Sequence, residues 1–219
     1  MRIGLIEEGE PIAGLFDIVV ADPPWRSDFG RTDSRSAERH YATMRLEDIC
    51  ALLVPAAKSS LLFLWCPGSM LPAGLGVMRA WGFSYRSQRV WVKPYFGVGH
   101  WFRSQHEVIL LGRKGAFPAP LRGTQPSSVL MAPRRRHSEK PERLQDDIER
   151  TFPGLRYLEL FARRERPGWT CWGDQLDSGA STTGNWRHAT RSERRGQLDA
   201  HPPNRDALST DSAPTAQEG

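Results

Sequence analysis

Hydrophobic residues in this chain occur in short, nearly continuous runs, separated by polar segments that contain proline or glycine. Short runs rich in valine, isoleucine, leucine and aromatic residues are typical of β-strands that are buried on both faces, as in a parallel sheet. The strands predicted in this way cover residues 16–21, 59–65, 83–93, 106–112, 129–131, 156–162 and 169–172.

Three helices are predicted between these strands. Thr43 stands where it can cap the first helix, and Pro72 and Pro141 stand near the first positions of the other two, where proline is tolerated. Strands that alternate with helices predict an α/β fold built on a layered sheet. The predicted helices cover residues 45–54, 72–81 and 138–152.

The composition divides the chain into two parts. All of the predicted strands and helices lie in residues 1–177, whereas from Ser178 onward the chain is polar and has almost no aliphatic residues. Such a segment does not bury enough apolar surface to order itself. We therefore predict one folded domain over residues 1–177, followed by a disordered tail over residues 178–219.

The charge balance is compatible with a polyanionic partner. The net charge is +5, and the basic excess belongs to residues 1–177 because the charges after Ser178 cancel. No run approaches the ~18 apolar residues of a membrane span, and the N-terminus lacks the basic-then-apolar pattern of a signal peptide. These features predict a cytoplasmic protein.

The cysteines and histidines do not indicate a disulfide framework or a metal. The cysteines are widely spaced without a C-x-x-C pair, which indicates buried thiols. The histidines that lie near predicted strand ends lack a compact ligand spacing, so no metal site is expected. The residues concerned are Cys50, Cys66, Cys171, His100, His106 and His137.

The tetrapeptide Asp22-Pro23-Pro24-Trp25 follows directly after the strand predicted at residues 16–21. Proline does not continue a β-ladder, so the strand stops there and presents its next residues at its carboxyl end, where open α/β sheets bind ligands. A carboxylate and a backbone carbonyl can accept the two N–H bonds of an amine such as that of adenine, and an indole can stack on the base. The motif alone is equally compatible with a plain strand-terminating turn.

Several separated motifs, taken together and in order, match one family. The chain resembles the MT-A-70 family of S-adenosylmethionine-dependent adenine N(6)-methyltransferases, and in particular its bacterial and phage members with the catalytic domain alone. The resemblance covers about residues 16–177. Besides residues 22–25, the matching motifs lie at residues 40–44, 62–65, 81–83, 91–94, 97–101, 105–107, 137–141, 159–163 and 172–177.

The resemblance implies a Rossmann-like methyltransferase fold with a mostly parallel central sheet, helices on both faces and a permuted motif order. It also implies that Asp22 contacts both the target amine and the charged end of the cofactor. Pro23 and Pro24 would supply backbone carbonyls, and Trp25 would line the base pocket.

The resemblance assigns further residues to the substrate and the cofactor. Tyr41 would lie on a gate loop near the adenine, with Glu107 and Lys140 flanking the pocket and Lys140 also reaching the cofactor. The positions that would hold the ribose and adenine of S-adenosylmethionine are Arg163, Asp174 and Gln175. Taken alone, Lys140 and Arg163 are also compatible with surface charges, and Glu107 with a structural ion pair to an arginine.

Two departures from the family pattern concern the cofactor end of the site. The family usually has an amide where this chain has Asp174, and a carboxylate accepts hydrogen bonds but does not donate them. Residues 164–167 do not show the His-Asn pair of eukaryotic relatives, so no role is transferred to them.

The function implied is methylation of the 6-amino group of adenine in DNA. DNA is favoured over RNA because a small stand-alone domain resembles the bacterial and phage members. The alternatives are an RNA adenine methyltransferase and a non-catalytic nucleic-acid-binding partner of the same fold. No separate recognition domain is visible, so specificity is expected from the loops at residues 26–44 and 113–137, or from a protein partner or dimer.

Overall fold

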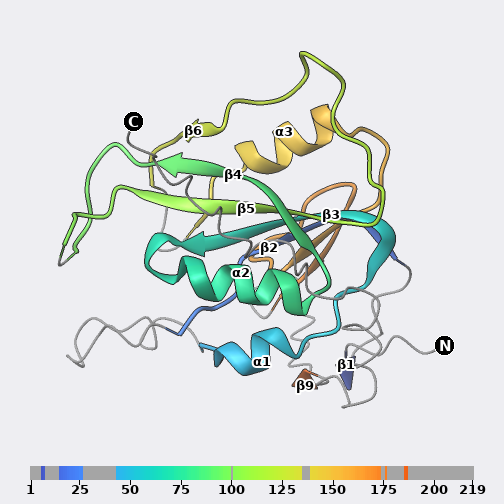
Figure 1. Ribbon diagram of the computed structural model, residues 1–219, viewed down its shortest axis with the longest axis horizontal. Coiled ribbons are helices and arrows are strands. Elements are labelled where there is room, and N and C mark those ends of the chain that lie inside the picture. The colour runs from blue at the N-terminus through green and yellow to red at the C-terminus, as the bar shows by residue number, and fades with distance from the viewer. Residues whose placement is uncertain are drawn as a thin grey trace, which may run out of the picture.

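The computed structural model describes residues 6–7, 15–26, 43–99, 101–134, 139–173, 176 and 185–186. Its centre is a seven-stranded sheet with the strand order β6-β4-β5-β3-β2-β7-β8 (Figure 1). Within this sheet β5 runs antiparallel to both of its neighbours, and the other pairings are parallel. The strands are β2 (Phe16–Ala21), β3 (Ala56–Pro67), β4 (Ser84–Val92), β5 (His106–Lys114), β6 (Val129–Met131), β7 (Tyr157–Leu160) and β8 (Trp169–Trp172).

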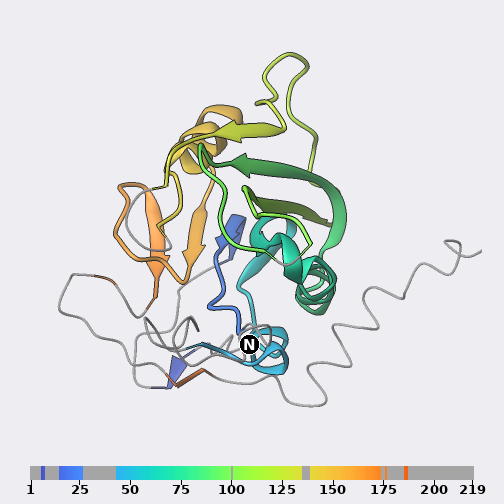
Figure 2. The same ribbon diagram turned by 90° about the vertical axis from the view of Figure 1, so that its left-hand side faces the viewer.

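Helices cover both faces of the sheet. Helices α1 (Leu46–Cys50) and α2 (Leu71–Ala80) lie on one face, and α3 (Arg143–Thr151) lies on the other (Figures 1 and 2). A short 3-10 turn, Gly68–Met70, leads into α2. The predicted α/β fold, with a mostly parallel sheet and helices on both faces, is therefore confirmed.

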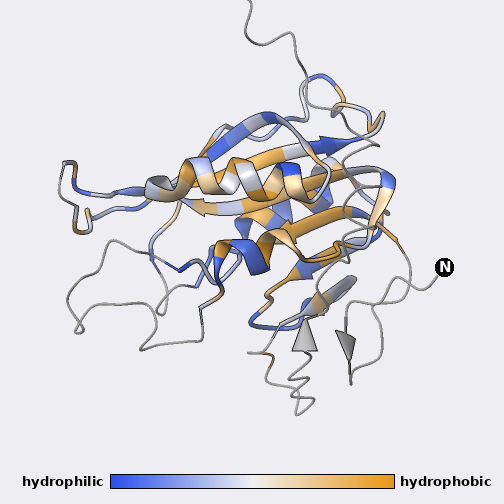
Figure 3. Cartoon of the chain, turned by 60° about the horizontal axis from the view of Figure 1, so that its bottom comes forward, coloured by the Kyte–Doolittle hydropathy of each residue, from blue (hydrophilic) through white to orange (hydrophobic). Residues whose placement is uncertain are grey.

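Strand β2 lies between β3 and β7 at the centre of the sheet and is buried on both faces. Ile18 and Val20 face the core under α3, whereas Val19 and Ala21 face the core shared with α1 and α2, and none is more than 1% exposed. This two-sided burial explains the continuous hydrophobic run, which appears as orange strands at the centre of Figure 3. The carboxyl end of β2 therefore opens at the middle of the sheet edge.

The element boundaries differ from the sequence prediction where packing rather than local pattern sets them. Helix α1 is shorter than predicted and is preceded by Arg45 as its N-cap, without the side-chain cap expected from Thr43. Strand β3 extends beyond the prediction at both ends, because Ala56 pairs with Phe16 of β2 and Pro67 pairs with Glu107 of β5. Helix α3 begins at Arg143 rather than at the predicted residue 138. Its N-cap residue is Glu142, so Pro141 lies just before the helix and not in its first turn.

Two very short strands lie outside the main sheet. Strand β1 (Ile6–Glu7) pairs antiparallel with β9 (Asn185–Trp186). Strand β9 belongs to the segment 178–219 that the composition predicts to be a disordered tail. The rest of that segment lies outside the described residues, so the division at residue 177 stays a prediction. Among the described residues, no helix is long and apolar enough to cross a membrane.

Candidate active site

The chain leaves the sheet at Asp22, directly after the last paired residue of β2. Ala21 is the final residue to pair with both β3 and β7. The carbonyl of Pro23 accepts the N–H of Trp25 at 2.8 Å, and the carbonyl of Pro24 accepts the N–H of Met44 at 2.9 Å. Each carbonyl oxygen has two lone pairs, so both prolines keep an acceptor position for a ligand.

Trp25 anchors this turn to the hydrophobic core. Its indole N–H donates to the carbonyl of Trp65 at 3.1 Å, and its ring is 7% exposed within the core shared with α1 and α2. The sequence analysis expected this ring to offer a stacking face, but the structure gives it the packing of a core residue. Its place in the base pocket stays a prediction.

A chain of alternating acids and lysines extends from Asp22 along the same sheet edge. Lys140 Nζ lies 2.9 Å from Asp22 Oδ2 and 3.3 Å from Glu107 Oε2, and Lys93 Nζ lies 2.6 Å from Glu107 Oε1. We refer to Asp22, Lys140, Glu107 and Lys93 as the acid–lysine chain. Three of its members were assigned to the site from the sequence, and Asp22 and Lys140 meet although they are 118 positions apart.

The topology of the sheet brings these four residues together. Asp22 follows β2, Lys93 follows β4 and Lys140 precedes α3. Glu107 lies near the start of β5, which is antiparallel, so the start of β5 lies where its neighbour β4 ends. Glu107 pairs with lysines rather than with the arginine that the sequence left open.

Two tryptophans form an aromatic wall beside the lysines. Lys140 Nζ lies 5.5 Å from the ring centroid of Trp65, and Lys93 Nζ lies 4.6 Å from that of Trp91. The two rings contact each other edge to face at 5.8 Å. The sequence analysis missed Lys93 and these rings as site residues, although motifs at residues 62–65 and 91–94 contain them.

Within the acid–lysine chain, ionisation of Asp22 is disfavoured. Burial is the largest effect on the pKa of Asp22 and raises it, Glu107 acts in the same direction, and the pKa is raised although Lys140 and Arg163 act to lower it. For Glu107, burial also acts to raise the pKa, but Lys140 and Lys93 outweigh it and the pKa is lowered. Burial would lower the pKa of Lys140, yet Asp22 and Glu107 raise it. A positive ligand group beside Asp22 would therefore be favoured.

The remaining predicted residues are only partly described. Arg163 follows β7, and its charge helps to lower the pKa of Asp22. Gly173, just after β8, lies so close to Ala162 that an added Cβ would be 2.2 Å from the Ala162 carbonyl oxygen. The residues next to Arg163 and the end of β8 are thus in contact. Tyr41, Asp174 and Gln175 lie outside the described residues.

Comparison with known proteins agrees with this arrangement. The MT-A70 family model matches residues 16–175. The Type II methyltransferase M.MunI of a Mycoplasma species is 32% identical over 183 residues, which cover 74% of this chain and 78% of that protein. The Drosophila N(6)-adenosine-methyltransferase MT-A70-like protein is 34% identical over 177 residues, which cover 76% of this chain and 28% of that protein.

The human N(6)-adenosine-methyltransferase catalytic subunit METTL3 is 32% identical over 177 residues, which cover 76% of this chain and 29% of that protein. The chain thus spans less than a third of these two animal relatives. The family match includes the turn at residues 22–25 and every member of the acid–lysine chain. The chain therefore belongs to the MT-A70 family of S-adenosylmethionine-dependent methyltransferases.

Proposed function

We propose that this protein transfers the methyl group of S-adenosylmethionine to the exocyclic 6-amino group of adenine in DNA. The observation that carries the proposal is the position of Asp22 at the carboxyl end of the central strand, beside a proline-fixed turn. Its carboxylate is largely buried, with 16% of the side chain exposed. The names of several relatives specify the N(6) position of adenosine, which supports adenine as the acceptor base. In this proposal residues 1–177 form the catalytic domain.

The described residues fit the charges of the cofactor. S-adenosylmethionine carries a sulfonium cation and an amino-acid end with one ammonium and one carboxylate. Asp22 would gain from a cation because burial raises its pKa, and Lys140 and Arg163 can face a carboxylate or hydroxyl groups. When bound, the cofactor supplies an electrophilic methyl group. Asp174 and Gln175 complete the expected binding set.

Asp22 and a proline carbonyl activate the amine in this proposal. The ionised carboxylate accepts one N–H of the 6-amino group, and the free lone pair of the Pro23 or Pro24 carbonyl accepts the other. These bonds draw the nitrogen lone pair out of the aromatic ring and aim it at the methyl group for in-line attack. The N–C bond would form as the S–C bond of the cofactor breaks and a neutral thioether leaves. The methylated amine would then release one proton to water, because the free amine is too weak an acid to lose it earlier.

The substrate is tested by offering unmodified DNA and unmodified RNA in parallel with labelled S-adenosylmethionine. Nucleosides are then separated and identified by mass spectrometry. We expect N(6)-methyladenine in DNA, as the chain matches M.MunI over most of the length of that protein. N(6)-methyladenine in RNA alone would leave the proposed mechanism unchanged but make RNA the substrate, in line with the relatives whose names specify adenosine. No transfer and no cofactor binding would favour a non-catalytic partner.

The pH dependence of the reaction is expected to report Asp22. Only the ionised carboxylate accepts an N–H, and burial raises its pKa above the ordinary 3.8. Activity, measured as kcat/KM, should therefore fall on acidification from a higher pH than an ordinary aspartate would give. Lys140→Met removes a cation that favours the ionised form of Asp22. In this variant the acid limb of the kcat/KM profile, where activity falls on acidification, should therefore lie at a still higher pH.

The matched control is Lys93→Met, which removes a lysine that contacts Glu107 rather than Asp22. Its acid limb is expected to move less than that of Lys140→Met. Circular dichroism at each pH verifies that the variants remain folded. If wild type and Lys140→Met lost activity at the same pH, Asp22 would not be the titrating group. The cytoplasmic location and a protein partner or dimer for target recognition stay predictions.

A further inference from the structure

An exposed hairpin lies between Lys93 and Glu107, two members of the acid–lysine chain. It joins the end of β4 to the start of β5 and comprises residues 94–105, of which all but residue 100 are described. We call it the aromatic loop. Lys93 precedes it and Glu107 follows it closely, so both of its ends lie at the proposed active site. It projects to the left of the sheet in Figures 1 and 3.

The rings of the aromatic loop point into solvent. Tyr95 is 82% exposed, Phe96 57%, Trp101 93% and Phe102 89%. These rings do not serve the core of the described fold, and so much apolar surface in one place is typical of an interaction site. The fold therefore does not account for them.

The backbone of the aromatic loop is nevertheless well organised. The N–H of Lys93 donates to the carbonyl of Gln105 at 2.8 Å, and Gln105 Nε2 donates back to the carbonyl of Lys93 at 3.0 Å. Ser104 N–H donates to the carbonyl of Val98 at 3.2 Å. A Cβ on Gly99 would lie 1.9 Å from the carbonyl oxygen of Phe102, so only glycine fits the tip. The hairpin holds its rings outward.

Cations accompany the rings, and acids are missing. The guanidinium of Arg103 lies 4.8 Å from the ring centroid of Phe96, and its Nε donates to the carbonyl of Gly97 at 3.2 Å. Arg134 also approaches Gly97, because a Cβ there would lie 3.0 Å from Arg134 Nη2. The sequence of the loop contains no aspartate or glutamate. Rings on which bases stack, beside cations that meet phosphates, are the pattern of single-stranded nucleic-acid sites.

We propose that the aromatic loop is a stacking surface for unpaired bases that flank the target adenine. This inference rests on the proposed function and extends it, because it makes a substrate with unpaired nucleotides beside the target the preferred one. Aromatic stacking accepts any base, so the loop adds affinity for unpaired strands and little sequence preference. The guanidinium and the absence of acids favour a nucleic acid over a protein as the occupant.

The test compares Trp101→Leu with Trp101→Phe. Both keep an apolar side chain, but only phenylalanine keeps a ring. Binding of a labelled single-stranded oligonucleotide is measured by fluorescence anisotropy at one fixed salt concentration, without S-adenosylmethionine. We expect Trp101→Leu to weaken binding by about 5- to 150-fold, as for the loss of one stacked base, and Trp101→Phe to retain most of the affinity. A fully paired duplex should be affected less.

Tyr85→Leu is the matched control, since Tyr85 is a 46% exposed ring near the opposite end of β4. It should leave oligonucleotide affinity unchanged. The proposal is overturned if Trp101→Leu binds the single strand as tightly as the wild type. It is also overturned if that variant changes only self-association in light scattering, which would make the loop a protein-docking surface. Because binding is measured without turnover, failure of methyl transfer would count against the proposed function and not against the aromatic loop.

Discussion

Replacing Asp22 with asparagine is expected to reduce methyl transfer to nucleic acid by about 10²- to 10⁴-fold, the range for loss of a positioned catalytic group. Asparagine keeps the size of the side chain but loses the negative charge beside Lys140. Its amide accepts a hydrogen bond less strongly than a carboxylate does. Replacing Asp22 with alanine removes the acceptor entirely and is expected to abolish transfer. Steady-state kcat/KM with labelled S-adenosylmethionine measures both.

Asp17→Asn provides a matched control for this prediction. Asp17 lies on the same strand β2 and is also ion-paired, with Arg156 Nη2 at 3.0 Å from its Oδ1. It lies near the other end of that strand from Asp22, so its loss should leave the rate unchanged. Arg156 is 59% exposed, so solvent screens this ion pair and its loss should change the stability little. Full activity of Asp22→Ala would contradict the mechanism.

Loss of activity in Asp22→Asn is not expected to come from unfolding. Burial raises the pKa of Asp22 in the folded state. A raised pKa means that Asp22 contributes stability below its unfolded pKa, and that this contribution is lost as the pH rises through the folded value. At neutral pH the ionised carboxylate is therefore a cost to folding, offset in part by Lys140. In Asp22→Asn, Lys140 keeps Glu107 as an ionised partner at 3.3 Å, so no buried charge is left unpaired and the protein should stay folded.

Local sequence pattern was sufficient to predict the central strands and the end of β2. The run at residues 16–21 has β-branched residues on both faces and a double proline after it, and these features fix the strand and its end without tertiary information. The full length of β3 was not predictable in this way. The strand begins at Ala56, and its first residues include the polar Lys58, which no hydrophobic pattern marks.

The residues of the candidate site also differ in whether the sequence predicted them. The resemblance to the MT-A70 family assigned Asp22, Glu107 and Lys140 to one site, and the structure shows them in contact. The contact of Lys93 with Glu107 and the burial of Trp25 were not predicted. Both depend on which side chains face each other across neighbouring strands, and a one-dimensional pattern does not specify this.

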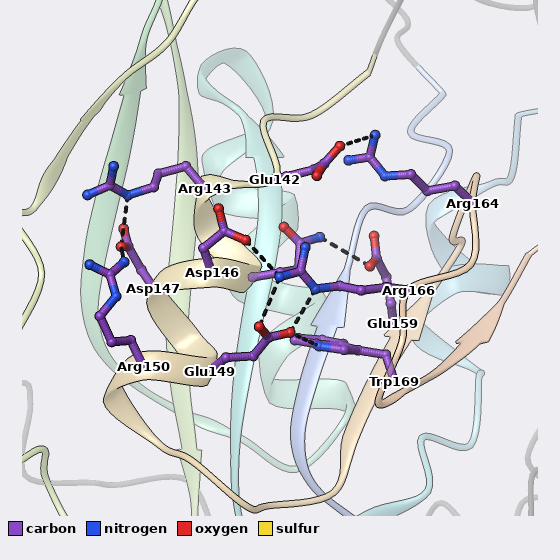
Figure 4. A network of polar contacts seen from close by, with 11 residues as sticks. Glu142, Arg143, Asp146, Asp147, Glu149, Arg150, Glu159, Arg164, Arg166 and Trp169 are labelled. Atoms are coloured by element: carbon purple, nitrogen blue, oxygen red, sulfur yellow. Dashed lines mark hydrogen bonds and ion pairs between the residues drawn. The ribbon is translucent and has the colours of Figure 1, made fainter.

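Nothing in the sequence marked the network that fastens α3 to the sheet. Toward β7 and β8, Arg166 Nε donates to Glu149 at 2.7 Å, and the indole of Trp169 donates to the same carboxylate (Figure 4). Toward β4, Arg89 Nη2 lies 2.8 Å from Asp147 Oδ2. Asp147 is only 3% exposed. Polar contacts therefore hold the helix on both of its flanks.

Replacing Asp147 with asparagine is expected to lower the free energy of unfolding by about 3–5 kcal/mol, the cost of breaking a buried ion pair from one side. Arg89, whose side chain is 13% exposed, would keep its charge without its carboxylate partner. Arg143 and Arg150, which also pair with Asp147, are about 60% exposed and remain solvated. Unfolding in urea, followed by circular dichroism, measures the change.

The stability that Asp147 contributes is also expected to depend on pH in the acidic range. Burial acts to raise the pKa of Asp147, but the arginines, Arg89 first, outweigh it and lower the pKa. A lowered pKa gives stability that is present above the unfolded value and is lost as the pH falls through the folded one. The difference in stability between wild type and Asp147→Asn should therefore shrink on acidification.

Two further variants separate the buried charge from a general effect of the substitution. Asp48→Asn changes an aspartate that pairs with the exposed Arg45, so solvent screens the pair and the free energy of unfolding should change far less than in Asp147→Asn. The double variant Asp147→Leu with Arg89→Met removes both buried charges together. Because apolar residues often replace a buried ion pair without loss, the double variant should recover much of the stability that Asp147→Asn loses. If the double variant were instead the less stable of the two, the cost would lie in the packing of α3 and not in an uncompensated charge.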